Sequence, residues 1–152
     1  MGRRRLSREI ALQALYAADV SHTPAAEAFA IVTRREGDGA DAETLFFARE
    51  LAFGTLERIE ELDGLISQRA RNWALNRMAA VDRNVIRLAA YELLARPETP
   101  VGVIIDEAIE IVRKYSAEEA TRFVNGILDA LKSLRLAPKP AKKNVRKKAP
   151  EP

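Results

Sequence analysis

The sequence predicts an all-α protein in which two small helical subdomains, divided near Arg71, pack against each other. Three observations predict this class. Alanine, leucine and glutamate abound while runs of β-branched residues are scarce. Apolar residues recur every three or four positions, the spacing of amphipathic helices. The length of 152 residues is that of about one domain. We therefore expect one helical domain over residues 1–136 and a tail over residues 137–152.

Three helices are expected in the first part of the chain. The first covers about residues 7–18, where the apolar positions share one side. A Thr-Pro pair at residues 23–24 supplies an N-cap and a first helical residue for the second helix, which extends to about Arg35. After a glycine-containing break, Asp41 caps a third, longer helix.

The second part begins with a short helix over about residues 63–69. The segment 81–94 is apolar nearly all round, which is typical of a central helix covered on more than one side. Prolines end this helix and set the start of the next, over residues 101–115. Ser116 and Glu119 have the spacing of a capping box, which predicts the start of a last helix with Ser116 as its N-cap.

Charge is distributed unevenly along the chain. The first eight residues hold four arginines and no acid, and the segment from Lys132 onward holds eight basic residues and one acid. Because the net charge of the chain is +3, the part between these ends carries −8. The basic ends are expected to seek polyanions that the acidic body repels. The tail is rich in proline and lysine, so we expect it to be disordered and to bind nucleic acid without sequence preference.

Composition argues against an enzyme. The absence of cysteine excludes thiol catalysis, iron–sulfur clusters and disulfides. His22 is the one histidine, so no histidine-based metal site is expected, and Asp106, Glu107 and Glu110 are interpreted as a solvated acidic face. No glycine-rich phosphate loop is found. We expect no cofactor and no metal. The chain lacks an apolar run of membrane-spanning length and a signal peptide, which predicts a cytoplasmic protein without membrane contact.

The arginines at the start point to RNA. The stretch "RRRLSREIALQALY" places Arg3, Arg4, Arg5 and Arg8 directly before an apolar helix, where the positive end of the helix dipole disfavours them. Either negative groups inside the protein compensate them or phosphates arrive from outside. Guanidinium groups pair with phosphates bidentately and stack on unpaired bases. We expect an arginine arm that contacts RNA, while Trp73 is interpreted as a packing anchor.

Three stretches of the sequence resemble segments of a known protein family. "RRRLSREIALQALY", "NWALNRMAAVDRNVIRLAAYELL" and "PVGVIIDEAIEIVRKYSAEEATRFVNGILD" resemble, in order and spacing, successive segments of the transcription antitermination factor NusB family. The resemblance covers the chain from Arg3 to about Leu134. It implies an all-helical fold of about seven helices, with two packed three-helix subdomains, in agreement with the helices expected above.

The resemblance also implies a function. NusB-like proteins bind boxA-type RNA of ribosomal RNA operons, together with the ribosomal protein NusE, and support antitermination by RNA polymerase. The arginines would then be the arm that reads RNA. The implied RNA-binding residues are Arg3, Arg4, Arg5, Arg8, Tyr16, Phe123 and Glu119. Asp82 matches an acidic position that resembles part of the contact with NusE. Some members of the family form homodimers, so a homodimer is possible here.

Two other functions stay open at this point. The chain resembles the NusB-like N-terminal domain of rRNA methyltransferases, although no catalytic segment is apparent in it. It also fits a structural dimer whose basic ends bind nucleic acid without selectivity. Competition with unrelated RNA separates this last function from selective boxA binding.

Overall fold

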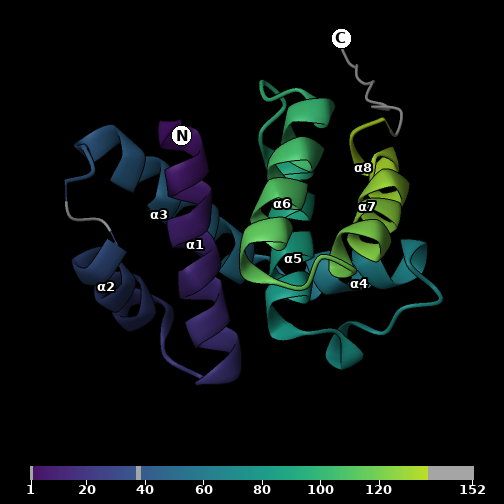
Figure 1. Cartoon of the computed structure of the whole chain (residues 1–152), viewed down its shortest axis with the longest axis horizontal. Coiled ribbons are helices and arrows are strands. Elements are labelled where there is room, and N and C mark those ends of the chain that lie inside the picture. Colours follow the sequence, from purple (N-terminus) through teal and green to yellow (C-terminus); the bar gives the residue numbers. More distant parts are fainter. Residues whose placement is uncertain (1, 37–38, 137–152) are drawn as a thin grey trace, which may run out of the picture.

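The computed structural model describes residues 2–36 and 39–136, and the regular elements of this part of the chain are all helices, without a strand. Seven helices exceed ten residues, which confirms the predicted class (Figure 1). A 3-10 turn, η1, and a short helix, α8, add to them. The elements are α1 (Arg3–Val20), α2 (Ala25–Glu36), α3 (Ala42–Glu57), α4 (Ile59–Arg69), η1 (Leu75–Arg77), α5 (Ala80–Ala95), α6 (Val101–Tyr115), α7 (Ala120–Leu131) and α8 (Ser133–Leu136).

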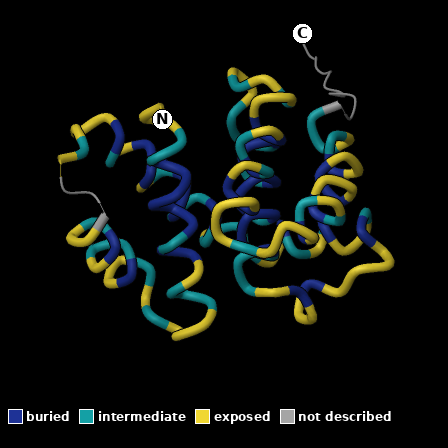
Figure 2. The backbone as a smooth tube through the Cα atoms, viewed as in Figure 1, coloured by how far each residue is buried: buried dark blue, intermediate teal, exposed yellow. Residues whose placement is uncertain are grey.

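The helices bury two apolar clusters. Helices α1, α2 and α3 enclose one, and α4 to α7 enclose the other, with α5 at the centre of the molecule. The prediction of a division near Arg71 is wrong, because Leu62 and Ile66 turn the buried face of α4 into the second cluster. The boundary therefore lies between α3 and α4. Figure 2 shows the buried positions along the inner sides of the helices and exposed backbone through much of the connection from α4 to α5.

The two clusters interlock where α1 meets α5. Leu12 of α1 belongs to the second cluster, and Leu88 of α5 belongs to the first. Tyr91 packs against both, and its ring lies so close to Gly54 of α3 that a side chain at position 54 would collide with it. The absence of a side chain at Gly54 thus permits the close approach of α3 and α5.

Three element boundaries differ from the prediction. Helix α4 begins at Ile59, four residues before its expected start at about residue 63. Helix α1 begins at Arg3, four residues before the expected start, so the arginines lie within the helix rather than before it. Ser116 does not cap the last helix. Its backbone N–H binds the carbonyl of Val112 and ends α6, while α7 begins at Ala120. Ser116 and Glu119 have the spacing of a capping box, but Ser116 ends α6 and does not begin α7.

Other expectations are met or fall outside the described part. The Asp41 side chain caps α3 by accepting a 2.8 Å hydrogen bond from the Thr44 N–H, as predicted. The expected disorder of the tail concerns residues 137–152, which lie outside the described residues. Among the helices that are described, none has both the length and the apolar character needed to cross a membrane.

Arg135 of α8 closes the C-terminal end of α5. Its Nε donates to the Leu93 carbonyl at 2.8 Å, and its Nη2 donates to the carbonyls of Glu92 and Arg96 at 3.2 and 2.9 Å. Its Nη1 reaches the Thr99 carbonyl at 2.9 Å. A cation is favoured there, because the last carbonyls of a helix have no intrahelical partners and carry the negative end of the dipole.

Replacing Arg135 is therefore expected to destabilise the fold. Arg135→Ala leaves half-buried carbonyls without partners and should lower the free energy of unfolding by about 2 kcal/mol in urea titrations. Arg113→Ala is the matched control, because Arg113 is an exposed arginine that pairs only with acids at the surface and should change stability by about 0.5 kcal/mol or less. Equal stabilities of the two variants would contradict the role of Arg135.

The cap at Asp41 predicts an acid-sensitive α3. Hydrogen bonds from the Thr44 side chain and backbone, together with Arg3, lower the pKa of Asp41 from 3.8 to about 2. Because the pKa is lower in the folded state, the contribution of this carboxylate is complete above about pH 4 and is lost as the pH falls toward about 2. Asp41→Asn keeps a capping group that does not titrate. Thermal melts should show a steeper loss of Tm over this window in the wild type, and parallel curves would contradict the assignment.

Candidate nucleic-acid interface

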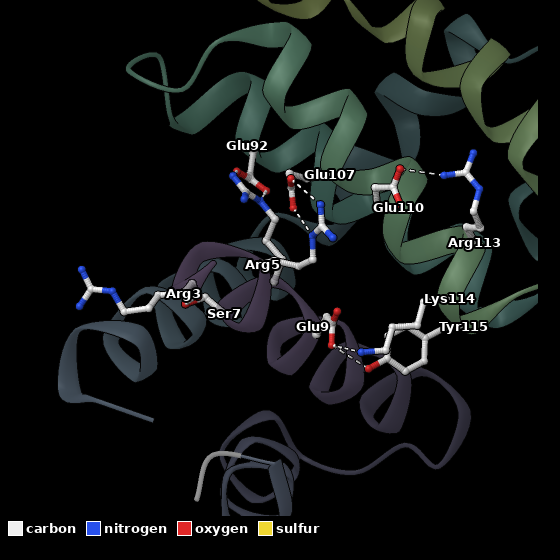
Figure 3. Close-up of polar contacts among 11 residues, drawn as sticks. Arg3, Arg5, Ser7, Glu9, Glu92, Glu107, Glu110, Arg113, Lys114 and Tyr115 are labelled. Atoms are coloured by element: carbon white, nitrogen blue, oxygen red, sulfur yellow. Dashed lines mark hydrogen bonds and ion pairs between the residues drawn. The ribbon is translucent and has the colours of Figure 1, made fainter. Parts of the chain in front are cut away.

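The four arginines at the start of α1 point in different directions. One turn of helix separates Arg4 from Arg8, and Arg5 lies beside them on the side that faces α6, whereas Arg3 points away from α6 (Figure 3). Three of the four pair with carboxylates of the protein. The helix start is therefore compensated largely from within, and an external polyanion is not required to explain it.

Arg8 is part of the interior. Its Nε and Nη2 each donate to a carboxylate oxygen of Glu92 at 2.8 Å, and the two residues are only 4% and 1% exposed. This parallel geometry is the strongest that an arginine and a carboxylate form. The guanidinium of Arg8 is thus committed to α5 and unavailable to a ligand at the surface, although the sequence placed Arg8 in the RNA-binding arm.

Arg5 makes a similar but more accessible pair. Its Nε and Nη2 donate to the two oxygens of Glu107 on α6 at 2.7 and 2.9 Å. The hydrogen bond from Arg5 lowers the pKa of Glu107, against the opposing effect of burial. Glu107 is therefore a structural partner of Arg5 and not one member of a solvated acidic face, which corrects the sequence interpretation.

Arg4 differs from its neighbours. It makes no ion pair with any carboxylate of the described residues, whereas Arg3, Arg5 and Arg8 each make one. Its Cζ lies over the ring of Phe47, 3.7 Å from the centroid, and the side chain is exposed. A guanidinium stacked on one face keeps its other face and its N–H groups for a ligand.

A hollow of about 340 Å³ opens beside Arg4. Arginines of α1 line it, together with Phe47 of α3 and residues of the connection between α5 and α6. The lining includes Arg4, Arg5, Arg8, Arg96, Glu98 and Thr99. Arg96 also stacks on Phe47, 4.9 Å from the centroid, while it pairs with Glu50. We call this hollow the arginine pocket. Its chemistry suits a phosphate with an adjoining base.

Arg3 lies at the outer edge of this region. Its Nη1 donates to Asp41 at 2.7 Å, and Glu43 lies within 3.3 Å, but all three side chains are largely exposed. Exposed pairs of this kind contribute little to stability and exchange readily with solvent. Arg3 is therefore able to turn from these acids to a phosphate.

Tyr16 and Asp82 lie at the other end of α1. The twelve residues from Arg4 to Tyr16 correspond to about 18 Å of helix. Tyr16 is 41% exposed and lines a mostly apolar hollow of about 340 Å³ together with Val81 and Tyr115. Asp82 is 3% exposed, and its Oδ1 lacks a hydrogen-bond partner among the described residues. Burial raises the pKa of Asp82, and a hydrogen bond from Ser116 opposes this rise. Asp82 therefore lies beneath the surface at this end.

The remaining predicted residues lie at the start of α7. Glu119 is exposed and occupies the N-cap position of α7 without a capping hydrogen bond from its side chain. Phe123 is half-buried and stacks on Trp73, with ring centroids 5.0 Å apart. The structure therefore divides the predicted RNA-binding residues among the arginine pocket, the interior, the Tyr16 hollow and the start of α7.

Sequence reasoning missed Phe47, Arg96 and the exposure of Trp73. The pair of phenylalanines in "LFFARE" contained a usable signal, because adjacent residues of a helix cannot both face the core. Phe47 is 4% exposed and Phe46 is 62% exposed. Arg96 carried no local signal, because it reaches the pocket only through the fold. No cluster of three or more metal-ligating side chains exists among residues 2–36 and 39–136.

Comparison with known proteins assigns the family. A model described as the NusB family matches residues 5–133. The chain belongs to the NusB family. One NusB-family relative is the transcription antitermination protein NusB of Elusimicrobium minutum, 49% identical over 138 residues that cover 89% of this chain and 96% of that protein. The NusB of Geobacter sulfurreducens is 44% identical over 133 residues.

Solved NusB structures share the fold. The structure of T. maritima NusB superposes with a TM-score of 0.80 at 37% identity and covers 92% of this chain and 96% of that chain. A crystal structure of the antitermination factors NusB and NusE in complex with double-stranded RNA superposes with a TM-score of 0.79 at 28% identity, over 86% of this chain and 96% of that chain. This NusB-family chain is thus a member of a family of transcription antitermination factors.

The buried ion pair between Arg8 and Glu92 predicts that Arg8 stabilises the fold of this NusB-family chain. Glu92→Gln leaves the buried charge of Arg8 without its counterion and should lower the free energy of unfolding by about 3 kcal/mol or more. The double variant Arg8→Met/Glu92→Met removes both charges and should regain most of that loss. Chemical denaturation measures both. A double variant that is no more stable than the single one would contradict a dominant cost from the unpaired charge.

Proposed function

We propose that this chain is an antitermination factor that binds boxA-type RNA of ribosomal RNA operons together with NusE. The observation that carries the proposal is Arg4, an exposed guanidinium that makes no ion pair among the described residues and lies over Phe47 in the lining of the arginine pocket. Its neighbours Arg3 and Arg5 add charge that exposed or half-buried carboxylates only partly neutralise. The complex of a similar NusB with NusE and RNA supports the same pair of partners.

The proposed RNA contacts are Arg3, Arg4 and Arg5, with Arg8 as their internal support. Each fits RNA for a physical reason. Arg3 exchanges a surface carboxylate for a phosphate, and Arg4 offers a stacking face. Arg5 contributes the edge of its guanidinium that does not bind Glu107. Arg8 anchors the first turns of α1 to α5, so that the other three are presented from a rigid helix.

The proposed contact with NusE lies at the opposite end of α1. The hollow beside Tyr16 is mainly apolar, which suits a protein side chain better than a phosphate. Val81 contributes to this hollow directly before the buried Asp82. Tyr16 is therefore proposed as a partner-binding residue, and Asp82 as a support beneath it. RNA and NusE then occupy different parts of one scaffold.

A salt-controlled titration tests the proposal. Labelled boxA-type RNA and a scrambled RNA of equal length are titrated with the full chain, with and without NusE. We expect boxA to bind more tightly, and the difference to grow when NusE is present. Equal binding of both RNAs, unchanged by NusE, would instead favour the nonselective dimer or the methyltransferase-type module.

Substitution of Arg4 locates the RNA contact. Arg4→Ala should reduce the slope of log K against log salt by about 0.7, the value for one contact to a single-strand phosphate. Arg4→Lys should restore the slope but not the full affinity, because lysine keeps the charge and loses the planar stacking face. Arg113→Ala is the control, since Arg113 is exposed on α6 and pairs with Glu110. An unchanged slope in Arg4→Ala would remove Arg4 from the interface.

A further inference from the structure

We propose that the C-terminal tail of this chain, residues 137–152, docks on the exposed face of α3, in a hollow lined by aromatic rings and carboxylates. The hollow measures about 420 Å³, and its lining includes Phe46, Glu50, Phe53, Glu57 and Tyr91. We call it the α3 hollow. The proposal goes beyond the proposed function, because it concerns a contact within the chain that sets how many cations the protein offers to RNA.

The α3 hollow has an aromatic ring that the rest of the described fold does not use. Phe46 is 62% exposed and, among the described residues, takes part in no ring stacking and no cation–π contact. Phe53 is already engaged, since its ring centroid lies 5.9 Å from that of Phe29 and 4.5 Å from the Cζ of Arg49. Proline-rich segments dock in grooves lined by aromatic rings, and lysine stems pack on the same rings. Phe46 therefore suits a segment rich in proline and lysine.

Charge at one end of the α3 hollow favours a cationic occupant. Glu57, the last residue of α3, and Glu60 of α4 are exposed and make no ion pair within residues 2–36 and 39–136. Arg58 between them is paired with Glu61 at 2.8 Å. The C-terminal end of a helix also carries the negative end of the dipole. Arg49 is the one cation among the lining residues that the structure describes, so lysines are expected near Glu57 and away from Arg49.

The last described residues lie on the helix that forms one wall of the α3 hollow. Arg135 binds the carbonyls of Leu93 and Arg96 at the end of α5, and Tyr91 of the same helix lines the hollow. Arg96 in turn pairs with Glu50 of the lining at 2.9 Å. Since α5 contacts both α8 and α3, two interhelical spacings, about 20 Å in all, lie between α8 and α3.

The length and composition of the tail fit this path. Residues 137–152 contain six basic residues, four prolines and one acid. At 3.1 Å per residue in the extended polyproline conformation, such a segment spans about 50 Å, which exceeds the distance from α8 to α3 more than twofold. A short tether also holds the segment at an effective concentration in the millimolar range. A weak contact is therefore sufficient for docking.

Two other surfaces with aromatic rings suit the tail less. The arginine pocket repels lysines, because Arg4 makes no ion pair among the described residues and Arg96 adds a second guanidinium over Phe47. Exposed Trp73 lies between Arg71 and Arg77 in the sequence, and both arginines are exposed. The α3 hollow thus combines an exposed ring with acids that make no ion pair.

Docking withholds the cations of the tail from nucleic acid. RNA binding then depends on the few oriented arginines at the start of α1, which position a strand. An undocked tail adds contacts to phosphates that carry no sequence information. The α3 hollow therefore limits nonselective binding by the tail.

Paramagnetic NMR on the full chain tests the contact. Because the chain contains no cysteine, Val145→Cys provides a single site for a nitroxide label in the tail. We expect selective broadening of the amide signals of residues 46–57 and of Tyr91. Phe46→Ala and Glu57→Gln should each weaken docking about 2- to 5-fold, the range for one exposed aromatic or ionic contact. Asp106→Asn is the matched control, because it removes an exposed acid of α6 and should leave the broadening unchanged.

The NMR outcomes decide the docking without RNA, so they leave the proposed function untouched. Broadening that is spread over the surface, or is concentrated on another face, overturns the α3 hollow as the docking site. Nitroxide-labelled chain is also mixed with unlabelled ¹⁵N chain. Broadening of the ¹⁵N signals in this mixture shows a contact between two copies and overturns docking within one chain.

RNA titrations test the consequence of docking. Phe46→Ala keeps the net charge and releases the tail, so it should bind scrambled RNA more tightly than the wild type does. The slope of log K against log salt should steepen by about 0.7 for each phosphate that the released tail reaches. An unchanged affinity and slope would overturn the limit on nonselective binding. If the wild type binds no RNA while the NMR contact is present, the proposed function fails and the docking stands.

Discussion

The buried pair of Arg8 and Glu92 sets the position of α1 against the rest of the molecule. A guanidinium and a carboxylate taken out of water tolerate little displacement, because a shift of either leaves an unpaired charge in the interior. Further links follow along the same side of α1. Arg5 binds Glu107, Glu9 accepts from Lys114 and Tyr115 at 2.9 Å, and Asp19 accepts from Arg83 at 2.6 Å. The two apolar clusters are thereby joined by polar contacts as well as by packing.

This arrangement also decides which positive charges reach the surface. An arginine-rich helix start does not by itself make a cationic surface, because the acidic body supplies internal partners for Arg5 and Arg8. Among the described residues, Arg4 makes no ion pair, Arg3 makes a weak exposed pair, and Arg5 keeps one edge of its guanidinium for a polyanion. A few oriented charges favour a defined register of the bound strand over a general affinity for nucleic acid.

Local patterns predicted the helices and the cap at Asp41, because periodicity and capping depend on residues a few positions apart. The partners of the arginines could not be predicted in this way. Arg5 and Glu107 are 102 positions apart, and Arg8 and Glu92 are 84 apart, so only the fold brings them together. The prediction for Ser116 was wrong because the spacing of a capping box does not show that this residue ends the preceding helix, α6. Trp73 was interpreted as a packing anchor, yet it is half exposed, because Phe123 covers just one face of its ring.

Leu12 of α1 packs in the second apolar cluster and Leu88 of α5 packs in the first, and this interlocking limits how the two subdomains can unfold. Neither subdomain can open fully while the other stays closed, since each holds a side chain from its neighbour. Amide protons in the middle of α1 and α5 should thus become accessible only in the same rare, global opening. Helix α2 contributes to one cluster alone and is free to fray separately. The scaffold between the two ends of α1 therefore behaves as one mechanical unit.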